Sequence, residues 1–265
     1  MWWLFGVLAL AASPPPGGWP PPPSSAVVAS VYDGDTLTLA TGDKVRLRWV
    51  NTPELKPEEA FGPEARAATE AFVGRGEVRL LLGSANPRDG YGRIVAGIET
   101  AAGSLSLHLL ELGLGHVFVI PPDPTDLAPM LAAQERARAA KLGIWSTDRY
   151  AGALHMTSFH ANGPGDDNLD PNGEYLRICN ISPGPVNLAG WRITRHDGRS
   201  YPLPNLVVPA GHTFELHSGP GPHLTDPAGQ LEVHLGATAG IWNDDHDRAT
   251  LYDPSGAISD ARDSH

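Results

Sequence analysis

Cysteine is almost absent from this chain of 265 residues, which contains Cys179 alone. A single cysteine excludes an internal disulfide, so the fold must rest on its apolar core. Cys179 lies in a run of alternating apolar residues, where we expect a buried thiol that packs as a small hydrophobic side chain. A reactive thiol is the alternative interpretation.

Basic residues are also scarce, with 19 lysines and arginines against 30 aspartates and glutamates and a formal net charge of -11. This balance argues against a protein that grips duplex DNA through a broad basic face. It is compatible with an enzyme whose positive charge lies only at a reacting phosphate. Residues 26–150 hold 13 basic and 16 acidic residues, whereas residues 151–265 hold 6 and 14, so the acidity is concentrated in the second block.

A long apolar run is missing from the amino-terminal segment. Residues 1–12 are apolar and end in small residues, but they are fewer than the ~20 residues that a membrane-spanning helix needs. This segment predicts a signal peptide, with an uncleaved anchor or a misplaced start codon as alternatives, because no basic residue precedes it. Residues 13–25 form a proline-rich, semi-rigid linker. We therefore expect a secreted or cell-envelope-exposed protein.

The next block, residues 26–150, combines short strands with helices. Strands are expected over 26–32, 36–39, 45–50, 77–82 and 93–98. Helices are expected to begin near Pro63 and to cover 105–112 and 127–142. Strands first, with helices interspersed and at the end, predict an OB-type five-stranded β-barrel with packed helices, an α+β domain.

The last block, residues 154–265, lacks a convincing helical pattern. Strand-like runs at 175–180, 190–195, 212–216 and 249–252 alternate with glycine, proline and asparagine turns. This pattern predicts an all-β sandwich. Its five histidines between 212 and 246 show no zinc spacing and are interpreted as scattered; they are His212, His217, His223, His234 and His246. Two acidic loops are interpreted as solvated, with calcium binding as the alternative; they contain Asp166, Asp167 and Asp170, and Asp244, Asp245 and Asp247.

Four short motifs within residues 33–93 together predict a phosphodiesterase site. They are Asp33-Gly34-Asp35-Thr36, Arg46, Asn51-Thr52-Pro53-Glu54 and Asp89-Gly90-Tyr91-Gly92-Arg93. Each motif alone has an ordinary alternative, such as a hairpin turn, a solvated arginine or a loop glutamate. Their coincidence in this order argues for a shared site.

Oxygen ligands come first in this set. The Asp35 carboxylate, the Asn51 amide oxygen and the Thr52 carbonyl are ligands of the kind that calcium prefers. Asp33 would orient a metal-bound water from outside the ligand set. We therefore expect Ca²⁺ as the cofactor.

A base and two arginines complete the set. Glu54 is the candidate general base, because a glutamate beside a metal can activate a water. Arg46 and Arg93 offer guanidinium forks that match phosphate oxygens and stabilise developing charge. A water activated by Glu54 would attack phosphorus in line.

Residues 27–150 resemble the thermonuclease (staphylococcal-nuclease-like) family. The resemblance rests on the Asp-Gly-Asp-Thr motif, the Arg-Leu strand that leads to Thr-Pro-Glu, the Asp-x-Tyr-Gly-Arg loop and the closing segment Ala137 to Ser146. It implies an OB-type barrel, calcium dependence, and cleavage of DNA and RNA that leaves 3′-phosphate ends.

The resemblance also implies roles for individual residues. Asp35 is implied as a metal ligand, Arg46 and Arg93 as the phosphate-binding catalytic arginines, and Glu54 as the base. Tyr91 matches a tyrosine that lies near the nucleotide phosphate.

Two departures from the family pattern stand out. Asn51 occupies a position where an aspartate binds the metal, which predicts weaker calcium binding. Val119 and Pro121 replace the tyrosines that pack on the base, with Phe118 and His116 nearby. Weaker base stacking is the expected consequence.

The last block resembles the lamin-tail domain, an immunoglobulin-like sandwich with no implied catalysis. The resemblance covers about a hundred residues and includes Gly173 to Asn180, Val186 to Trp191, Val208 to His212 and Asp247 to Asp253. Trp191 and Trp242 are expected in its core. A cell-envelope or protein partner is expected for this domain by analogy.

The leading hypothesis is a secreted, calcium-dependent, sugar-nonspecific endonuclease that acts as a monomer and prefers single strands. The alternative is a catalytically silent nuclease-fold module that binds nucleic acid or protein. Retention of Asp35, Arg46, Glu54 and Arg93 favours the enzyme.

Overall fold

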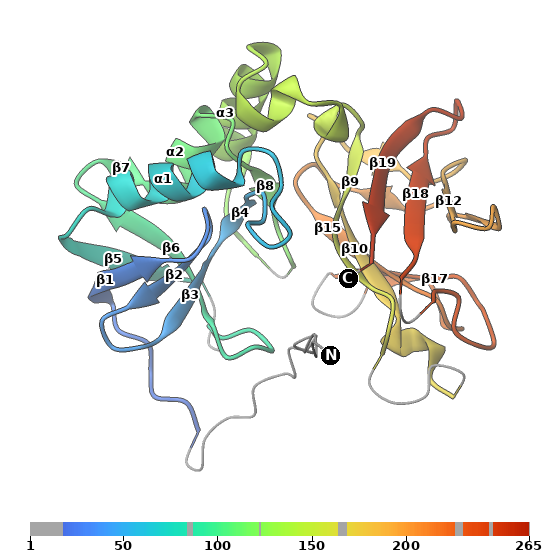
Figure 1. The fold of residues 1–265 in the computed structure, drawn as a ribbon, viewed down its shortest axis with the longest axis horizontal. Coiled ribbons are helices and arrows are strands. Elements are labelled where there is room, and N and C mark those ends of the chain that lie inside the picture. The colour runs from blue at the N-terminus through green and yellow to red at the C-terminus, as the bar shows by residue number, and fades with distance from the viewer. Residues whose placement is uncertain are drawn as a thin grey trace, which may run out of the picture. The chain divides into compact units, whose positions relative to one another are not determined.

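A computed structural model of the chain describes residues 18–83, 87–121, 123–163, 169–225, 230–243 and 246–264. The predicted signal peptide and residues 13–17 of the predicted linker lie outside the described residues. The fold comprises two compact units (Figure 1). One contains the residues up to Arg48 and Thr52–Leu109, and the other contains Trp49–Asn51 and Leu110–His265. The domain boundaries expected from the sequence, 26–150 and 154–265, stay a prediction.

The first unit is built on a closed five-stranded barrel. Its strands are β1 (Ser25–Val31), β2 (Thr36–Leu39), β3 (Lys44–Leu47), β5 (Glu77–Leu82) and β6 (Ile94–Thr100). They pair antiparallel in the order β3-β2-β1-β5-β6, and β7 (Gly103–Ser104) pairs antiparallel with the end of β6. β3 and β6 then pair in parallel, with Val45 opposite Ile94. This pairing closes a mixed sheet and confirms the predicted OB-type barrel.

The barrel core follows from alternation along the strands. Leu37 and Leu39 on β2, and Val45 and Leu47 on β3, are all buried. Side chains alternate between the two faces of a strand, so the intervening Arg46 points out of this core. Each fully buried aliphatic side chain stabilises the folded state by about 1.5–3 kcal/mol relative to an exposed one. The burial of Val45 and Leu47 therefore places the Arg46 side chain on the opposite face of β3.

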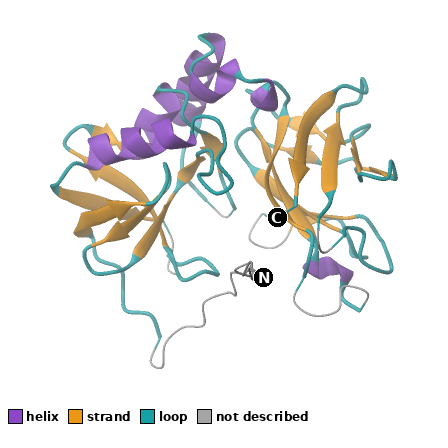
Figure 2. Ribbon diagram, in the orientation of Figure 1, coloured by secondary structure: helices purple, strands orange, loops and turns teal. Residues whose placement is uncertain are grey.

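Two helices pack on this barrel (Figure 2). α1 (Gly62–Val73) begins with proline in its first turn and buries Ala65, Thr69 and Val73, a spacing of four residues that places them on one face. α2 (Leu105–Glu111) ends just before Gly113, which has a φ of +67°. Both helices were predicted from the sequence and are confirmed.

The expected single strand over 45–50 is wrong in one respect, because the chain breaks it after Leu47. Trp49 has a φ of +68°, a left-handed conformation that bulky residues rarely adopt. Its indole nitrogen donates to Asp123 at 2.8 Å. A separate strand β4 (Trp49–Asn51) then pairs with β8 (His116–Phe118) in the second unit. Burial of the Trp49 side chain and this hydrogen bond stabilise the left-handed backbone. The alternation of apolar residues in the sequence does not reveal such a conformation.

The second unit contains two main sheets. The first has the order β16-β17-β15-β10-β9, with bounds Leu224–Thr225, Leu231–His234, Thr213–His217, Tyr175–Asn180 and Leu154–His160. The second has the order β13-β12-β18-β19, with bounds Ser200–Pro202, Arg192–Thr194, Arg248–Tyr252 and Ile258–Asp263. A short pair, β11 (Val186–Asn187) and β14 (Val207–Val208), accompanies them. These strand-rich sheets agree with the predicted immunoglobulin-like sandwich.

One apolar core belongs to this sandwich. Trp191 and Trp242 are buried in it, as predicted, and the Phe159 ring meets the Trp242 ring edge-on with centroids 4.8 Å apart. Cys179 is fully buried, and burial raises the pKa of its thiol. The burial confirms the prediction of a packed thiol. A buried thiol with a raised pKa stays protonated and is therefore unreactive.

α3 (Ala128–Ala139) also belongs to the second unit, and the 3₁₀ turn Gly143–Ser146 follows it. The Gln134 side chain accepts a hydrogen bond from the Val117 N–H at 2.7 Å and donates to the Ile181 carbonyl at 3.1 Å. These two bonds tie the helix to β8 and to the loop after β10. Among the described residues, no helix combines the length and apolar character needed to cross a bilayer.

The polar loops of the sandwich differ in part from expectation. Asp166, Asp167, Asp244 and Asp245 lie outside the described residues. Asp247 is buried, with its carboxylate 2.9 Å from the Arg195 Nε, so it is not a solvated loop residue. The interpretation of the histidines as scattered is wrong for His217 and His234. Their rings stack with centroids 5.1 Å apart, because strand pairing joins positions that are distant in sequence.

Candidate active site

The turn between β1 and β2 carries two buried carboxylates. Asp33 Oδ1 accepts the N–H groups of Asp35 at 3.1 Å and Thr36 at 2.7 Å. This is the turn-forming use of an aspartate side chain. Asp33 and Asp35 are 4% and 6% exposed. Asp33 therefore shapes the turn that presents Asp35, and both interpretations of this motif fit the same geometry.

Gly34 allows this turn to pack closely on its neighbours. A Cβ at this position would lie 2.7 Å from Thr52 Cγ2 and 2.8 Å from Ala65 Cβ. The Gly34 carbonyl accepts a hydrogen bond from Thr69 Oγ1 of α1 at 2.6 Å. A side chain at position 34 would push the turn away from the Thr52 segment.

Asp35 joins two of the sequence motifs directly. Its Oδ2 accepts the backbone N–H of Thr52 at 2.8 Å and the Thr52 hydroxyl at 3.1 Å. Its Oδ1 lies 3.1 Å from Arg46 Nη1. Arg46 is directly opposite Thr36 in the β2–β3 pair, so the hairpin register carries its guanidinium to the turn. A charge-assisted contact of this kind is among the stronger hydrogen bonds in proteins.

Glu54 lies in the same electrostatic neighbourhood. Burial, followed by the charges of Asp35 and Asp33, raises the pKa of Glu54 to about 7, against the opposing effect of Arg46. Burial and the neighbouring Asp35 also raise the pKa of Asp33, to about 6. Three carboxyl groups therefore share one partly buried region and disfavour each other's ionisation.

The loop before β6 holds Arg93 in a defined position. Asp89 Oδ1 accepts the N–H groups of Tyr91 and Arg93, each at 3.0 Å. Asp89 Oδ2 accepts a hydrogen bond from Arg93 Nε at 2.7 Å. Gly92 has a φ of +77°, which favours glycine. The sequence placed Asp89 in the motif but assigned it no role; its spacing of four residues from Arg93 was the available signal.

Strand topology brings Arg46 and Arg93 to neighbouring strands. Arg93 directly precedes β6, and Ile94 at the start of β6 is opposite Val45 of β3. Arg46 follows Val45 by one residue. The barrel closure therefore determines that both arginines come from the same end of an adjacent parallel pair.

The charge balance of this region fits a hard divalent cation. Asp33, Asp35 and Glu54 supply carboxylate oxygens, and burial together with the nearby carboxylates raises the pKa values of Asp33 and Glu54. Oxygen donors of this type suit a cation of the calcium class. Asn51 ends β4 and belongs to the second unit. Its role as a ligand, and that of the Thr52 carbonyl, stay predictions.

The candidate base-stacking residues lie in the second unit. His116 is completely buried and Val119 is 2% exposed, whereas Phe118 and Pro121 are half-buried. Tyr91 in the first unit is exposed, and the Arg93 guanidinium lies 5.3 Å from its ring centroid. A buried imidazole cannot stack on a nucleotide base without rearrangement, so His116 does not replace the missing tyrosines.

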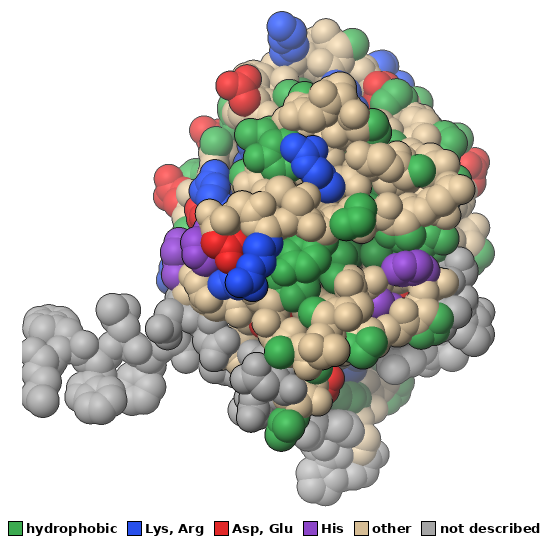
Figure 3. Space-filling view, turned by 90° about the vertical axis from the view of Figure 1, so that its right-hand side faces the viewer, with side chains coloured by type: hydrophobic (Ala, Val, Ile, Leu, Met, Phe, Trp, Pro, Cys, Tyr) green, Lys and Arg blue, Asp and Glu red, His purple; other side chains and the backbone are tan. Residues whose placement is uncertain are grey.

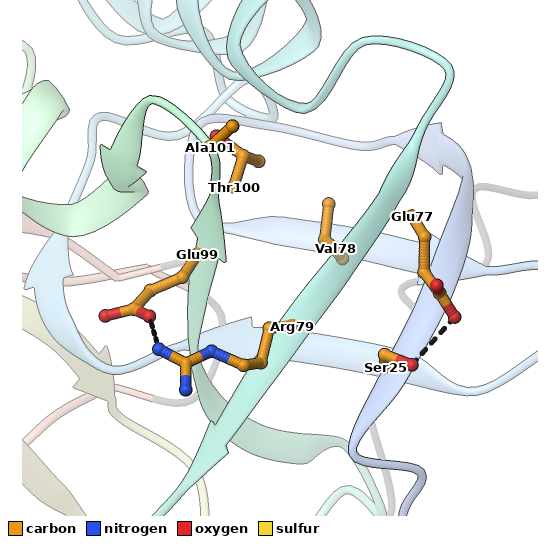
Figure 4. A pocket seen from close by; sticks show the side chains of 7 residues that line it. All are labelled: Ser25, Glu77, Val78, Arg79, Glu99, Thr100 and Ala101. Carbon is orange, nitrogen blue, oxygen red and sulfur yellow. Dashed lines mark hydrogen bonds and ion pairs between the residues drawn. The ribbon is translucent and has the colours of Figure 1, made fainter.

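A surface pocket of the first unit lies apart from these motifs (Figure 4). It is lined by residues of β1, β5 and β6, among them Ser25, Glu77, Arg79 and Glu99. Figure 4 shows Glu77 pointing to Ser25 and Arg79 to Glu99, and these pairs are hydrogen bonded. The polar groups of the pocket thus satisfy each other.

Surface charge gives no broad nucleic-acid footprint on the face drawn in Figure 3, where basic and acidic side chains of the described residues occur singly or in small groups. This distribution agrees with the acidic balance of the whole chain.

Comparisons with known proteins agree with this geometry. The model of the family described as Staphylococcal nuclease homologue matches residues 44–147, and that of the Lamin Tail Domain matches residues 147–264. The chain is 31% identical over 126 residues to a thermonuclease of Staphylococcus intermedius, which covers 45% of the chain and 74% of that relative.

Two relatives from Bacillus subtilis (strain 168) are also similar. Endonuclease YncB is 30% identical over 126 residues, which cover 44% of the chain and 60% of the relative. The SPbeta prophage-derived endonuclease YokF is 29% identical over 126 residues, which cover 44% of the chain and 43% of the relative. The chain thus spans about half the length of these two relatives. It belongs to the staphylococcal nuclease homologue (thermonuclease) family and carries a lamin tail domain after its nuclease domain.

Proposed function

We propose that the protein is a nuclease that hydrolyses phosphodiester bonds of DNA and RNA and leaves 3′-phosphate ends. The observation that carries the proposal is the convergence of Asp35 with Arg46 and Thr52 in one partly buried region of the barrel, with Glu54 in the same electrostatic field. The names of the relatives, thermonuclease and endonuclease, support the same activity.

Glu54 is the proposed general base. A pKa near the working pH allows a carboxylate to accept a proton and still be ionised in much of the protein, and the pKa of Glu54 is raised to about 7. Glu54 takes one proton from a water, and the water oxygen forms a bond to phosphorus. The bond from phosphorus to the 5′-oxygen breaks in line, and the leaving oxygen acquires a proton from solvent.

The arginines are proposed to stabilise the phosphorane-like charge. Arg46 and Arg93 donate hydrogen bonds to the phosphate oxygens, which carry more negative charge in the transition state than in the substrate. Asp89 keeps Arg93 oriented through Nε. Tyr91 lies beside this guanidinium and is proposed to contact the nucleotide phosphate.

Calcium is the proposed cofactor. Asp35, Asn51 and the Thr52 carbonyl would hold it, and when bound it would neutralise the clustered carboxylates and polarise the phosphate. Asp33 is proposed to orient a water near it, in addition to forming the turn. Asn51 carries no charge, so the affinity for calcium is proposed to be weak.

Secretion or exposure at the cell envelope is proposed from the apolar segment at residues 1–12. The lamin tail domain is proposed to bind a cell-envelope or protein partner and to take no part in catalysis. The protein is proposed to act as a monomer on single strands. Base stacking is proposed to be weak, because Val119 is buried and lacks an aromatic ring.

A catalytically silent module that binds nucleic acid or protein is the second candidate. The substitution of Asn51 for an acidic ligand favours it, because a cation site with one charge fewer is harder to fill. Under this alternative the arginines would bind phosphate without turnover.

Cleavage of single-stranded DNA and RNA by the purified chain tests the proposal. Activity is measured in calcium, in magnesium and in chelator, beside Glu54→Gln and Arg93→Ala. Arg79→Ala is the control, because Arg79 is an exposed barrel arginine that pairs with Glu99 outside the site. We expect calcium-dependent cleavage with 3′-phosphate ends that is lost in both site variants and kept in the control. No cleavage by the unmutated protein in any metal would support the silent module.

A further inference from the structure

Two Glu-x-His sequences lie side by side in the lamin tail domain. Glu215 and His217 are on β15, and Glu232 and His234 are on β17. The two strands are parallel and pair in register, with Glu215 opposite Glu232 and His217 opposite His234. Because side chains alternate along a strand, all four point to the same face.

The opposite face of these strands confirms this arrangement. Leu216 and Val233 lie between the polar residues and are fully buried in the sandwich core. Core packing therefore fixes the register, since a slip by one residue would bring the charged side chains into the core. The four polar side chains cannot leave this face while the sandwich is folded.

Three of these side chains converge on one point. The ligand atoms of Glu215, His217 and Glu232 all lie within 4.8 Å of one another. His217 Nε2 is 3.4 Å from Glu215 Oε2. A tetrahedral cation with bonds of about 2.0–2.2 Å needs ligand atoms roughly 3.3–3.6 Å apart. Small side-chain rotations are enough to reach this spacing.

Neighbouring groups orient two of these ligands. His217 Nδ1 lies 3.1 Å from the Asn172 carbonyl oxygen. A carbonyl only accepts, so Nδ1 carries a proton, and Nε2 is the nitrogen through which the neutral ring would bind a cation. Arg177 pairs with Glu215 through Oε1, which leaves Oε2 on the side of His217. Outer contacts of this kind are typical of protein metal sites.

The cluster is sheltered but accessible. The side chains of Glu215, His217 and Glu232 are 16%, 14% and 30% exposed. The His234 ring stacks against His217, and its Nε2 is 3.8 Å from Glu232 Oε2. Ion pairing between the histidines and glutamates is the simpler explanation for this packing, and it predicts no metal affinity.

We propose that Glu215, His217 and Glu232 bind a divalent transition cation of the zinc class, with His234 bordering the site. One imidazole and two carboxylates form a mixed nitrogen and oxygen donor set that suits such a cation. Three protein ligands leave a fourth position for water. Bound metal would link β15 to β17 and stabilise the sandwich by mass action. The proposal is independent of nuclease activity.

Metal titration of the full chain tests the site. Chelator-stripped protein is titrated with Zn²⁺ by calorimetry in excess calcium, which fills sites for hard cations. Co²⁺ is followed by its visible absorption. We expect one equivalent to bind, with affinity at least about tenfold lower in His217→Gln and in Glu232→Gln, the scale of loss common at metal sites. His246→Gln is the control, because His246 is an exposed histidine of the same unit, and its affinity should match the parent.

Two results of the titration itself would overturn the proposal. One is zinc affinity in both site variants equal to that of the parent, and the other is absence of zinc binding by the folded parent. Thermal unfolding in chelator checks that each variant folds. If His217→Gln does not fold, the test rests on two variants at position 232, Glu232→Asp and Glu232→Gln. Glu232→Asp retains a carboxylate and should keep zinc-dependent stabilisation, whereas Glu232→Gln should lose it; equal behaviour of the two would contradict the site.

Discussion

Arg46 Nη1 lies 3.1 Å from Asp35 Oδ1, and Arg46 also donates to the Leu47 carbonyl at 2.9 Å. The guanidinium is therefore held in place before any substrate arrives. Pre-orientation of this kind reduces the reorganisation needed when charge develops on a phosphate. The same contact gives Asp35 a counterion within a group of carboxylates.

Arg46→Ala should lower cleavage of single-stranded DNA by about 10²–10³, the cost of losing one preorganised donor. Arg46→Lys should recover little, because an ammonium cannot make the forked contact. Steady-state rates at saturating calcium measure both effects. Rates equal to the parent in Arg46→Ala would remove this arginine from the mechanism.

Asn51→Asp should raise the affinity for calcium, because it adds one negative charge to the proposed ligand set. We expect the calcium concentration for half-maximal cleavage to fall. The cleavage rate in magnesium without calcium should change little. The measurement is a calcium titration of activity beside the parent. A half-maximal concentration that is unchanged or raised would show that position 51 does not contact the cation.

Gly34→Ala should destabilise the first unit by about 1–3 kcal/mol, the usual cost of overpacking. The added Cβ would lie 2.7 Å from Thr52 and 2.8 Å from Ala65. Gly76→Ala is the matched control, because a Cβ there meets nothing within 4 Å. Urea unfolding of the two variants compares their free energies. Equal stability would mean that the turn can shift at no cost.

Asp260 should make the second unit sensitive to acid. Burial alone would raise its pKa, but the neighbouring His155 and the Met156 N–H outweigh burial and lower it. A carboxyl group with a lowered pKa stabilises the fold above its unfolded value of about 4, and this contribution is lost as pH falls through the folded value. Asp260→Asn should therefore be less stable than the parent near neutral pH, with a gap that narrows below about pH 4. Thermal unfolding across this range measures the gap, and a constant gap would contradict the assignment.

Several parts of the fold could be predicted from local signals. The burial of Trp191 and Trp242 was expected from the lamin-tail resemblance, Pro63 marks the start of α1, and Gly113 follows the end of α2. The break at Trp49 could not be predicted, because its left-handed backbone is held by burial and by the contact with Asp123. Periodicity reports which face a residue prefers and says nothing about such tertiary constraints.

The candidate site divides in the same way. Residue types and motif order are enough to predict Asp35, Arg46, Glu54 and Arg93 as site residues. The positioning role of Asp89 does not follow from residue type, since its contact with Arg93 depends on loop geometry.

The sequence by itself determined the two domains' family resemblance, the barrel strands and the set of chemically competent residues, because these depend on local pattern and composition. The tertiary structure alone decided which residues meet. Barrel closure between β3 and β6 brought the two arginines to one end of a strand pair. The parallel register of β15 and β17 placed His217 beside His234. Pairing between distant strands depends on burial over the whole unit, and no short stretch of sequence contains that information.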